Sequence, residues 1–369
     1  MTRNFDTIIL GAGMVGVSAA LHIQARGRSV AIIDRLGKAG AETSYGNAGL
    51  IERSSIFPYM FPREPAALLR YALNRSPEAH YHFSALPGLA GWLLRYWMNS
   101  SPEGALRSAK AALPLIERSL SEHEALMQAS GSMHLLSYSG WMKLCRSQAS
   151  FDKAIVEANK LIPYGRAFDI LDRAALQERE PSLQGPLAGA VHLRDPGVVK
   201  DPGGLAESYA QLFLSRGGQM ISGDASGLRQ DGNGWSLTAH DQRISASNVV
   251  VALGPWSDIV YGPLGYKIPM AVKRGYHMHY ALQPGAMLNV PVLDVEGGYV
   301  LAPMVRGIRL TTGAEFARRD APPTPVQIER TEPMARALLP LGNRLDDKPW
   351  MGARPCLPDM LPVIGPAPR

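Results

Sequence analysis

The pattern of apolar positions opens with a short continuous run at residues 7–10, which is typical of a buried strand. A turn at residues 11–16 follows, with glycine at positions 11, 13 and 16, and it leads into an apolar pattern of helical period. A second apolar run at residues 29–33 ends in an aspartate at position 34. Strand, glycine turn, helix and strand in this order predict a βαβ unit of a doubly wound α/β sheet.

Farther along the chain, α and β patterns mix. The spacing of apolar residues predicts helices over 102–130, 150–161, 173–179 and 202–216. Strands are expected at 133–136 and 219–221, with a hairpin at 231–234. The run 248–254 is almost entirely apolar and predicts a parallel strand buried on both faces, at the centre of the first sheet. Short alternating segments between 268 and 313 predict antiparallel strands, so a second domain is threaded through the first.

The segment Leu86–Trp97 is rich in leucine and aromatic residues and leaves two interpretations open. The favoured interpretation is that the segment packs on a core or against another subunit. The alternative is that it lies in a membrane interface with Trp92 and Trp97 as anchors. No stretch of the sequence has the length of a transmembrane helix.

Composition narrows the class of protein. A chain of 369 residues with 46% hydrophobic residues supports two domains with real cores. The net charge of +6 comes from scattered basic residues, which favours an ordinary solvated surface over a nucleic-acid site. The two cysteines, Cys145 and Cys356, form no paired motif, which suits a reducing compartment, and no secretory signal precedes the first strand. We therefore expect a cytoplasmic protein, with a peripheral contact on the inner face of the membrane left open.

The glycine turn carries the first chemical prediction. Only glycine permits the tight turn at Gly11, the close approach of a pyrophosphate at Gly13 and the close helix–strand packing at Gly16. The helix that follows presents unpaired N–H groups to the phosphates. The carboxylate of Asp34 can accept hydrogen bonds from the hydroxyls of an adenosine ribose.

Four motifs occur in order along the chain: the glycine turn, Glu42-Thr43-Ser44-x-x-Asn47-Ala48-Gly49, Val250-Val251-Ala252-Leu253-Gly254-Pro255-Trp256-Ser257 and Gly352-Ala353-Arg354-Pro355. With them the chain resembles the D-amino-acid oxidase and dehydrogenase family of FAD flavoproteins, and within it the bacterial D-amino-acid dehydrogenases. The resemblance implies a Rossmann-type FAD-binding domain and a discontinuous α+β substrate domain built on an antiparallel sheet. We expect the FAD-binding domain at 1–85, 198–262 and 350–369, and the substrate domain at 86–197 and 263–349.

The resemblance also implies the cofactor contacts. Residues of the loop after the second strand would bond phosphate or ribitol and run beneath the isoalloxazine ring, with ordinary Asx and Ser turns as the alternative. The residues expected to bind FAD are Gly11, Gly13, Met14, Val15, Gly16, Asp34, Arg35, Thr43, Ser44, Asn47, Ala48, Gly49, Leu50, Ala225, Gly254 and Trp256.

For the substrate, the resemblance points to Arg354, whose guanidinium would pair with the carboxylate of an amino acid. The alternative is a structural arginine that binds carbonyl groups. Tyr299 falls on the strand that lines the family's pocket, and its hydroxyl would reach the same carboxylate, with a packed aromatic as an equal alternative. Both are assigned as catalytic residues.

Two histidine pairs are candidate metal ligands. His277 and His279 share one face of a predicted strand, and His80 and His82 have the same spacing. A metal needs further ligands, and the sequence shows none, so we predict pocket-wall or surface side chains and no metal.

The resemblance implies an oxidoreductase that converts a small amino acid, with a D-amino acid preferred, to a 2-oxo acid and ammonia by hydride transfer from Cα to flavin N5. Glycine, sarcosine or a cyclic or secondary amino acid is the first alternative, and an inactive flavoprotein or scaffold subunit is the second. Expected partners are the amino acid and an electron acceptor, which is a quinone, oxygen or a carrier protein; a homo-oligomer is left open. Relatives continue beyond the position of Arg369 with a strand, a turn at the flavin and a closing helix, so weakened FAD binding is also expected.

Overall fold

The computed structural model describes residues 2–367, and these divide into two compact units. Unit 1 comprises the chain up to Asn47, Ser121–Leu136 and Asp201–Ile268. Unit 2 comprises Ala48–Leu120, Ser137–Lys200 and the chain from Pro269 onward. The chain thus passes between the units several times, as the mixed patterns predicted.

Unit 1 is built on a sheet that has six strands within residues 2–367. Their order is β10 (Gln219–Ser222), β2 (Val30–Asp34), β1 (Thr2–Leu10), β13 (Gln242–Val251), β12 (Gly234–Ala239) and β11 (Arg229–Asp231). The strands β10, β2, β1 and β13 are parallel, and β12 and β11 continue the sheet in antiparallel pairing. The carboxyl ends of β1, β2 and β13 therefore lie at one edge of the sheet, which confirms the predicted βαβ start.

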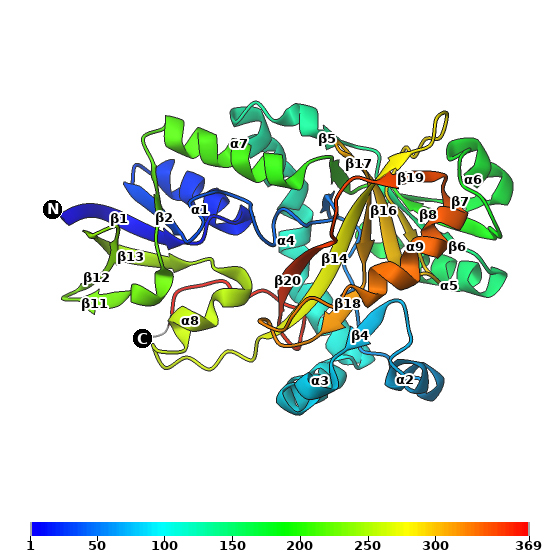
Figure 1. Cartoon of the computed structure of the whole chain (residues 1–369), viewed down its shortest axis with the longest axis horizontal. Coiled ribbons are helices and arrows are strands. Elements are labelled where there is room, and N and C mark those ends of the chain that lie inside the picture. The colour runs from blue at the N-terminus through cyan, green and yellow to red at the C-terminus, as the bar shows by residue number, and fades with distance from the viewer. Residues whose placement is uncertain (1, 368–369) are drawn as a thin grey trace. The chain divides into compact units, whose positions relative to one another are not determined.

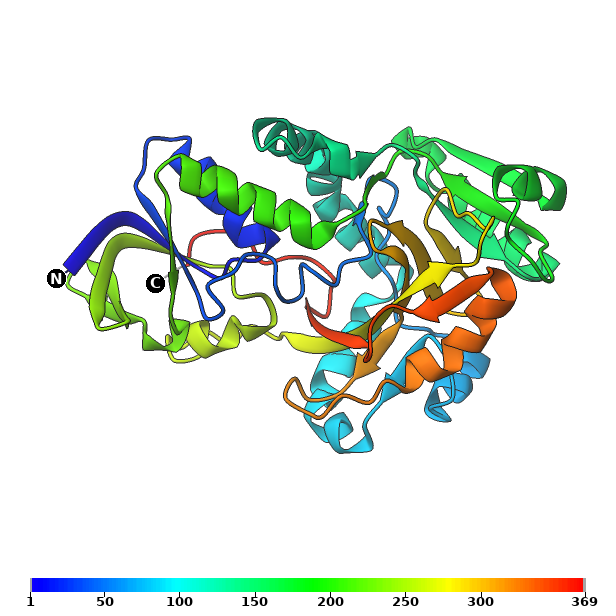
Figure 2. The ribbon, with the colours of Figure 1, turned by 45° about the horizontal axis from the view of Figure 1, so that its top comes forward.

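Helices α1 (Met14–Gln24) and α7 (Pro202–Ser215) lie side by side on one face of this sheet (Figures 1 and 2). The sequence explains where α7 begins, because the Asp201 side chain accepts a hydrogen bond from Gly204 N at 2.9 Å and Pro202 occupies the first turn. The fully buried Tyr209 and Phe213, four residues apart, form its apolar stripe. A short helix, α8 (Asp258–Tyr261), follows the end of β13.

The strand predicted at 248–254 is present as part of β13 and pairs in parallel with β1, as expected. Its predicted burial on both faces is wrong for the residues described here, since Val251 is 38% exposed and Val249 and Val250 are only half-buried. The continuous apolar run therefore forms the partly exposed carboxyl end of β13 rather than a fully enclosed strand. The expected strand at 133–136 is mostly a single 3₁₀ turn, Met133–Leu135, followed by β5 (Leu136–Ser137).

Unit 2 is built on a larger sheet, which has eleven strands within residues 2–367. These are β4 (Ala79–Tyr81), β18 (Ala314–Phe316), β14 (Ala271–Leu282), β17 (Gly307–Thr312), β16 (Tyr299–Met304), β15 (Val292–Asp294), β6 (Trp141–Cys145), β8 (Gly189–Leu193) and β7 (Phe168–Asp172), with β19 (Leu341–Arg344) and β20 (Trp350–Cys356) paired to β14. Most pairs are antiparallel, as predicted for the substrate domain. Among the described residues, a third and short sheet has the strand order β3 (Leu50–Ile51), β9 (Gly197–Val199) and β5.

Alternation along the long strands gives this sheet two different faces. Helix α9 (Val326–Leu338) packs against β14 and β17, and the buried Tyr276, Met278 and Leu310 lie in the same apolar core as its Ile328. We call this side the helix face. Because side chains alternate along a strand, residues 275, 277 and 279 of β14 lie on the opposite face.

The remaining helices of unit 2 surround this sheet. They are α2 (Pro65–Ala72), α3 (Leu86–Asn99), α5 (Gln148–Asn159), α6 (Arg173–Arg179) and the first part of α4 (Pro102–Ala129). In α3, Trp92 is buried and packs with Tyr96 and Ala271, whereas Trp97 is 39% exposed. The favoured core interpretation therefore holds for Trp92. No helix within residues 2–367 combines the length and apolar content that a membrane span needs.

The units differ from the domain boundaries expected from the sequence. Residues 48–85 and β20 belong to unit 2, because β20 pairs along its length with β14. The end of α4 belongs to unit 1, where His123 Nδ1 lies 3.0 Å from the hydroxyl of Tyr209. Pro368 and Arg369, the last residues of the expected FAD-binding domain, lie outside the described residues.

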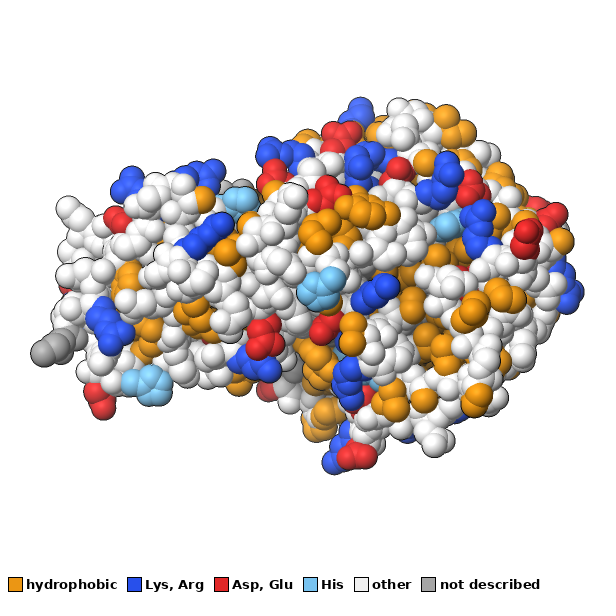
Figure 3. Space-filling view, turned by 90° about the horizontal axis from the view of Figure 1, so that it is seen from above, with side chains coloured by type: hydrophobic (Ala, Val, Ile, Leu, Met, Phe, Trp, Pro, Cys, Tyr) orange, Lys and Arg blue, Asp and Glu red, His pale blue; other side chains and the backbone are white. Residues whose placement is uncertain are grey.

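One face of the molecule shows the predicted scatter of charge (Figure 3). On the face drawn in Figure 3, basic and acidic side chains lie among one another without a large patch of one sign.

Candidate flavin and substrate sites

The glycine turn between β1 and α1 is held tightly by backbone. Gly11 has φ +102°, and a Cβ there would lie 2.6 Å from the carbonyl oxygen of Ala252, at the end of β13. At Gly16 a Cβ would lie 1.9 Å from the carbonyl oxygen of Gly11. Neither position can carry a side chain, because the blocking atoms are main chain. The turn needs these two glycines for its own packing.

Gly13 differs from Gly11 and Gly16 in the space around its Cα, and this space tests whether the turn fits a dinucleotide. Its backbone is extended, with φ −71° and ψ 175°, and a Cβ would meet only Ser44 Oγ, at 3.3 Å. Protein packing alone therefore does not require glycine here. A ligand passing the N-terminus of α1 does require it, since a pyrophosphate approaches the backbone at this point. The residues present fit FAD.

Asp34, at the end of β2, ties the turn to its strand. Its Oδ2 accepts a hydrogen bond from Ala12 N at 2.9 Å, and its Oδ1 accepts one from Leu36 N at 2.9 Å. A carboxylate has about four acceptor positions, so two remain for ribose hydroxyls. Asp34 thus has a structural role beside the predicted one.

The loop after β2 reaches back to the helix. Ser44 Oγ accepts a hydrogen bond from Met14 N at 2.9 Å, so the serine serves as a cap for α1, which lacks one from Gly13. Its hydroxyl hydrogen stays available to a phosphate. Asn47 N donates to Ser44 O at 3.4 Å, so the loop makes the local turn that we considered as the alternative. Thr43 belongs to this loop, while Val15 stands 72% exposed at the start of α1.

Two further predicted residues join this part of unit 1. The guanidinium of Arg35 lies 4.1 Å from the centre of the Trp256 ring, and it also pairs with Glu42. Gly254 has φ +55°, with no atom within 4 Å of a Cβ, so space is open above it. The side chain of Ala225, by contrast, is 5% exposed and packs in the core of unit 1.

Gly49 lies in unit 2, and its requirement for glycine has a cause that the sequence did not indicate. With φ +79°, a Cβ there would lie 2.3 Å from the carbonyl oxygen of Val199 and 3.2 Å from Met304 Cε. The backbone also bonds here, since Val199 N donates to Gly49 O at 2.6 Å. The close approach at Gly49 is thus to protein backbone. Ala48 and Leu50, its neighbours, belong to the same segment of unit 2.

Arg354 lies on β20, beside Lys273 of β14, and its guanidinium rests over Gly275. A Cβ at Gly275 would lie 2.3 Å from Arg354 Nη2, so the absence of a side chain at this glycine leaves space for the guanidinium. The guanidinium therefore lies on the face of the sheet opposite the helix face. Arg354 Nη1 donates to Gly313 O at 3.2 Å and Nη2 donates to Thr312 O at 3.3 Å. Both partners are neutral carbonyl groups.

The electrostatics of Arg354 show a cation without a counter-ion. Removal from water lowers its pKa, and only the Cys356 thiol and the Tyr59 hydroxyl act in the other direction. Among the described residues, no carboxylate pairs with it, whereas the shielded Arg146 and Arg274 of the same unit pair with Asp294 and Glu315. A partly buried guanidinium with neutral protein partners is suited to a carboxylate ligand.

Tyr299 is placed differently from the prediction. It is 1% exposed and lies on the helix face, opposite Thr312 and in the same core as Leu301. Its hydroxyl accepts a hydrogen bond from Arg146 Nη2 at 3.3 Å, and Arg146 pairs with Asp294 at 2.6 Å. Burial, followed by the charge of Asp294, raises the pKa of Tyr299. The packed-aromatic alternative describes this residue, and we remove it from the proposed site.

His277 and His279 share the opposite face of β14, as predicted, but neither is a surface residue, with exposures of 1% and 0%. His277 stacks on Trp350 with ring centres 4.7 Å apart. His279 Nδ1 lies 2.7 Å from Asp346, and its Nε2 accepts from Arg309 Nε at 3.0 Å. These partners leave His279 no free nitrogen for a metal.

Glu52 is a residue that the sequence analysis missed. It follows β3, is largely withdrawn from water, and burial raises its pKa. Its Oε2 accepts a hydrogen bond from Ser55 N at 3.1 Å. A carboxyl group with a raised pKa often marks a functional site. No motif surrounds Glu52, so only its environment in the fold could have drawn attention to it.

Comparison with known proteins identifies the family. The sequence profile described as FAD dependent oxidoreductase matches residues 6–369. A D-amino-acid oxidase of Bradyrhizobium diazoefficiens is 27% identical over 379 residues, covering 99% of this chain and 88% of that protein. A D-amino acid dehydrogenase of Paramagnetospirillum magneticum is 28% identical, covering 98% of this chain and 87% of that protein.

Solved structures agree on the fold. Glycine oxidase from Geobacillus kaustophilus superposes with a TM-score of 0.71 at 22% identity, covering 99% of this chain and 86% of that one. Iminodiacetate oxidase from Chelativorans sp. gives 0.69 at 19% identity, covering 98% and 86%. The chain belongs to the family of FAD-dependent oxidoreductases. It is therefore a flavoenzyme, as the ordered motifs predicted.

Proposed function

We propose that this enzyme oxidises the Cα–N bond of a small amino acid, with D-amino acids as the preferred class, to an imino acid that hydrolyses to a 2-oxo acid and ammonia. The observation that carries the proposal is the guanidinium of Arg354, lodged over Gly275 with two carbonyl groups and no carboxylate as described partners. The names of the relatives, a D-amino-acid oxidase and a D-amino acid dehydrogenase, support the substrate class.

The residues of the chain contribute binding and orientation. When bound, FAD supplies the chemistry of hydride acceptance. The glycine turn and Asp34 would hold its pyrophosphate and ribose in unit 1. Arg354 would bind the substrate carboxylate with its planar fork, which fixes the direction of the Cα–H bond. The substrate amine must be neutral so that its lone pair assists the departure of hydride.

A second substrate class has an observation in its favour. Two of the structural neighbours are a glycine oxidase and an iminodiacetate oxidase, whose substrates carry an unsubstituted Cα. Glycine, sarcosine and cyclic or secondary amino acids also present a carboxylate to Arg354, so they stay as the alternative. The proposal includes an electron acceptor, which is oxygen, a quinone or a carrier protein.

The test uses the full chain loaded with FAD and a panel of D-amino acids, their L-enantiomers, glycine, sarcosine and proline. Production of 2-oxo acid and ammonia is measured with oxygen, with a soluble quinone and with an artificial dye as acceptor. We expect turnover of small D-amino acids to exceed that of their L-enantiomers at least tenfold. Turnover confined to glycine and sarcosine would select the alternative, and no turnover of any panel member would refute both.

A further inference from the structure

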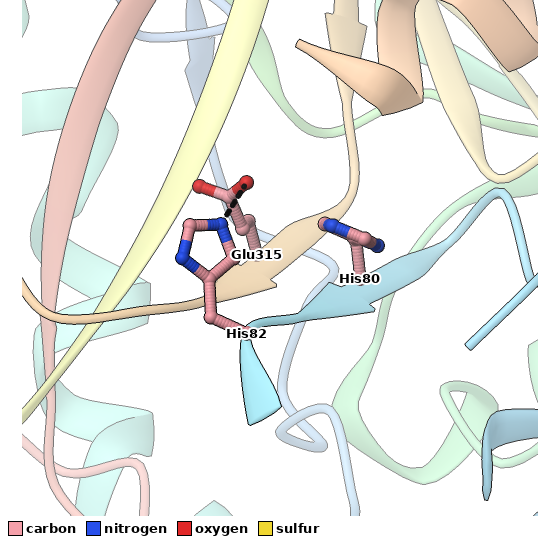
Figure 4. Close-up of side chains that lie close together, drawn as sticks. All are labelled: His80, His82 and Glu315. Atoms are coloured by element: carbon pink, nitrogen blue, oxygen red, sulfur yellow. Dashed lines mark ion pairs between the residues drawn. The ribbon is translucent and has the colours of Figure 1, made fainter. Parts of the chain in front are cut away.

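A cluster of three side chains lies at the end of the large sheet of unit 2. His80 and His82 come from β4 and the residue after it, and Glu315 comes from β18 (Figure 4). We propose that His80, His82 and Glu315 form a binding site for a divalent transition-metal ion of the zinc class. The proposal does not depend on the flavin chemistry proposed above.

The sheet itself brings the three groups together. Strands β4 and β18 pair in parallel, with His80 directly opposite Glu315. Side chains two residues apart on a strand share one face, so His82 joins them. One ligand atom from each residue lies within 4.8 Å of the other two. Atoms bound to one zinc ion at about 2.0–2.2 Å lie roughly 3–4 Å apart, so small side-chain rotations close the site.

The carboxylate is already oriented for this role. Glu315 is fully buried, and its Oε2 accepts hydrogen bonds from Arg274 Nε at 2.6 Å and from the Tyr276 hydroxyl at 2.9 Å. Its other oxygen, Oε1, faces His82 Nε2 at 3.5 Å. Outer hydrogen bonds of this kind fix ligating carboxylates in known metal sites. Arg274 and Tyr276 would thus serve as the supporting partners of the ligand.

One feature of the histidines favours a bound ion over simple packing, and one contact would have to change when an ion binds. His80 Nδ1 is buried, and it has no hydrogen-bond partner among the described residues. A buried polar atom without a partner calls for an explanation, and an ion is one of the recognised causes. His82 Nε2 lies 2.8 Å from Thr324 Oγ1, whose hydroxyl bonds Glu315 Oε1. Thr324 therefore bridges the ligand atoms and would move aside or bind the ion with its oxygen.

The chemistry of the donors selects the ion. Two imidazoles and one carboxylate are suited to Zn²⁺, Co²⁺ or Ni²⁺, whereas Mg²⁺ and Ca²⁺ prefer sites made of oxygen alone. The Arg274 guanidinium bonds the same carboxylate, and Arg330 also acts on His80. These positive charges repel a cation, so we expect micromolar affinity rather than the tight binding of a structural zinc site.

The test measures metal binding directly. Full-length protein, produced without a histidine tag and treated with chelator, is dialysed against Zn²⁺, and the bound metal is counted by elemental analysis. We expect one ion per chain at saturation, with a dissociation constant in the micromolar range. Replacement of Zn²⁺ by Co²⁺ gives a second readout, because visible absorption bands of bound Co²⁺ report nitrogen and oxygen ligation.

The variants His80→Gln and His82→Gln should each weaken Zn²⁺ binding at least tenfold, while circular dichroism and bound flavin stay unchanged. The matched control is His134→Gln, since His134 is exposed and its Nδ1 lies 3.2 Å from Gly131 O, within its own turn. Glu315 is left intact, because its removal would strand the buried Arg274. Binding without saturation at one ion per chain, or full binding in either His80→Gln or His82→Gln, would overturn the proposal.

Discussion

The two units hold functional residues in different ways. In unit 1, most candidate flavin residues lie between Gly11 and Asn47 along the chain, and main-chain atoms leave no space for a side chain at Gly11 and Gly16. In unit 2, Arg354 depends on a glycine in another strand, Gly275, and on which face of the sheet its side chain occupies. The residues that form a local turn can be found from one contiguous motif. The residues that meet on a sheet depend on the register of strand pairing, which the sequence does not show.

The largest effect is expected for Gly16→Ala in unit 1. The added Cβ would lie 1.9 Å from a backbone oxygen, and backbone cannot move aside as a flexible side chain can. We expect the turn and the start of α1 to be lost, with a fall in unfolding free energy of about 3 kcal/mol or more. Thermal unfolding of the native chain and the variant, both without FAD, measures this fall in unfolding free energy. Unchanged stability would mean that the turn has another conformation.

The next effect comes from Gly13→Ala, a matched change three residues earlier. Its Cβ would meet only Ser44 Oγ at 3.3 Å, so the protein without FAD should keep its stability within about 0.5 kcal/mol. FAD affinity should fall at least tenfold, because the methyl group enters the space of the pyrophosphate. Titration of the chain with FAD, followed by fluorescence, gives the dissociation constant. Equal affinity in the variant would remove the pyrophosphate from this position.

The contrast between the units also explains what the sequence could predict. The βαβ start and helices α5, α6 and α7 follow from local patterns and capping residues such as Asp201, and the structure has them. The pairing of β20 with β14 joins distant parts of the chain, so no local pattern around Arg354 indicates that this motif lies beside β14. The side of the sheet on which Tyr299 lies likewise depends on its pairing with Thr312, and no local sequence pattern predicts that pairing.

The same limit applies to the histidines. The spacing of His80 and His82 was visible in the sequence, but the third group, Glu315, reaches them only through the pairing of β4 with β18. His277 and His279 have the same spacing, so the sequence does not separate the two pairs. Their neighbours in the fold, Trp350 and Asp346, distinguish the two pairs.

In unit 2, Arg354→Lys should raise the KM for amino acids about tenfold or more, with the spectrum of bound flavin unchanged. An ammonium group is a point charge and cannot replace the planar fork that binds a carboxylate in two places. Substrates with an amide in place of the carboxylate should be poor for the native enzyme for the same reason. Steady-state kinetics and the visible spectrum measure both effects. Loss of flavin with an unchanged KM would make Arg354 a structural residue.

The smallest effect is expected for Tyr299→Phe, and it tests the argument from strand faces. The change removes the hydroxyl that accepts a hydrogen bond from Arg146, while Arg146 keeps its ion pair with Asp294. Stability should fall by about 1 kcal/mol, the usual contribution of one hydrogen bond. The KM for amino acids should stay within twofold of the native value, because the hydroxyl lies on the helix face, away from the face that carries Arg354. Thermal unfolding and steady-state kinetics on the same preparation separate the two quantities. A rise in KM comparable to that of Arg354→Lys would return Tyr299 to the substrate site and show that strand alternation alone does not decide which side chains of this sheet meet the substrate.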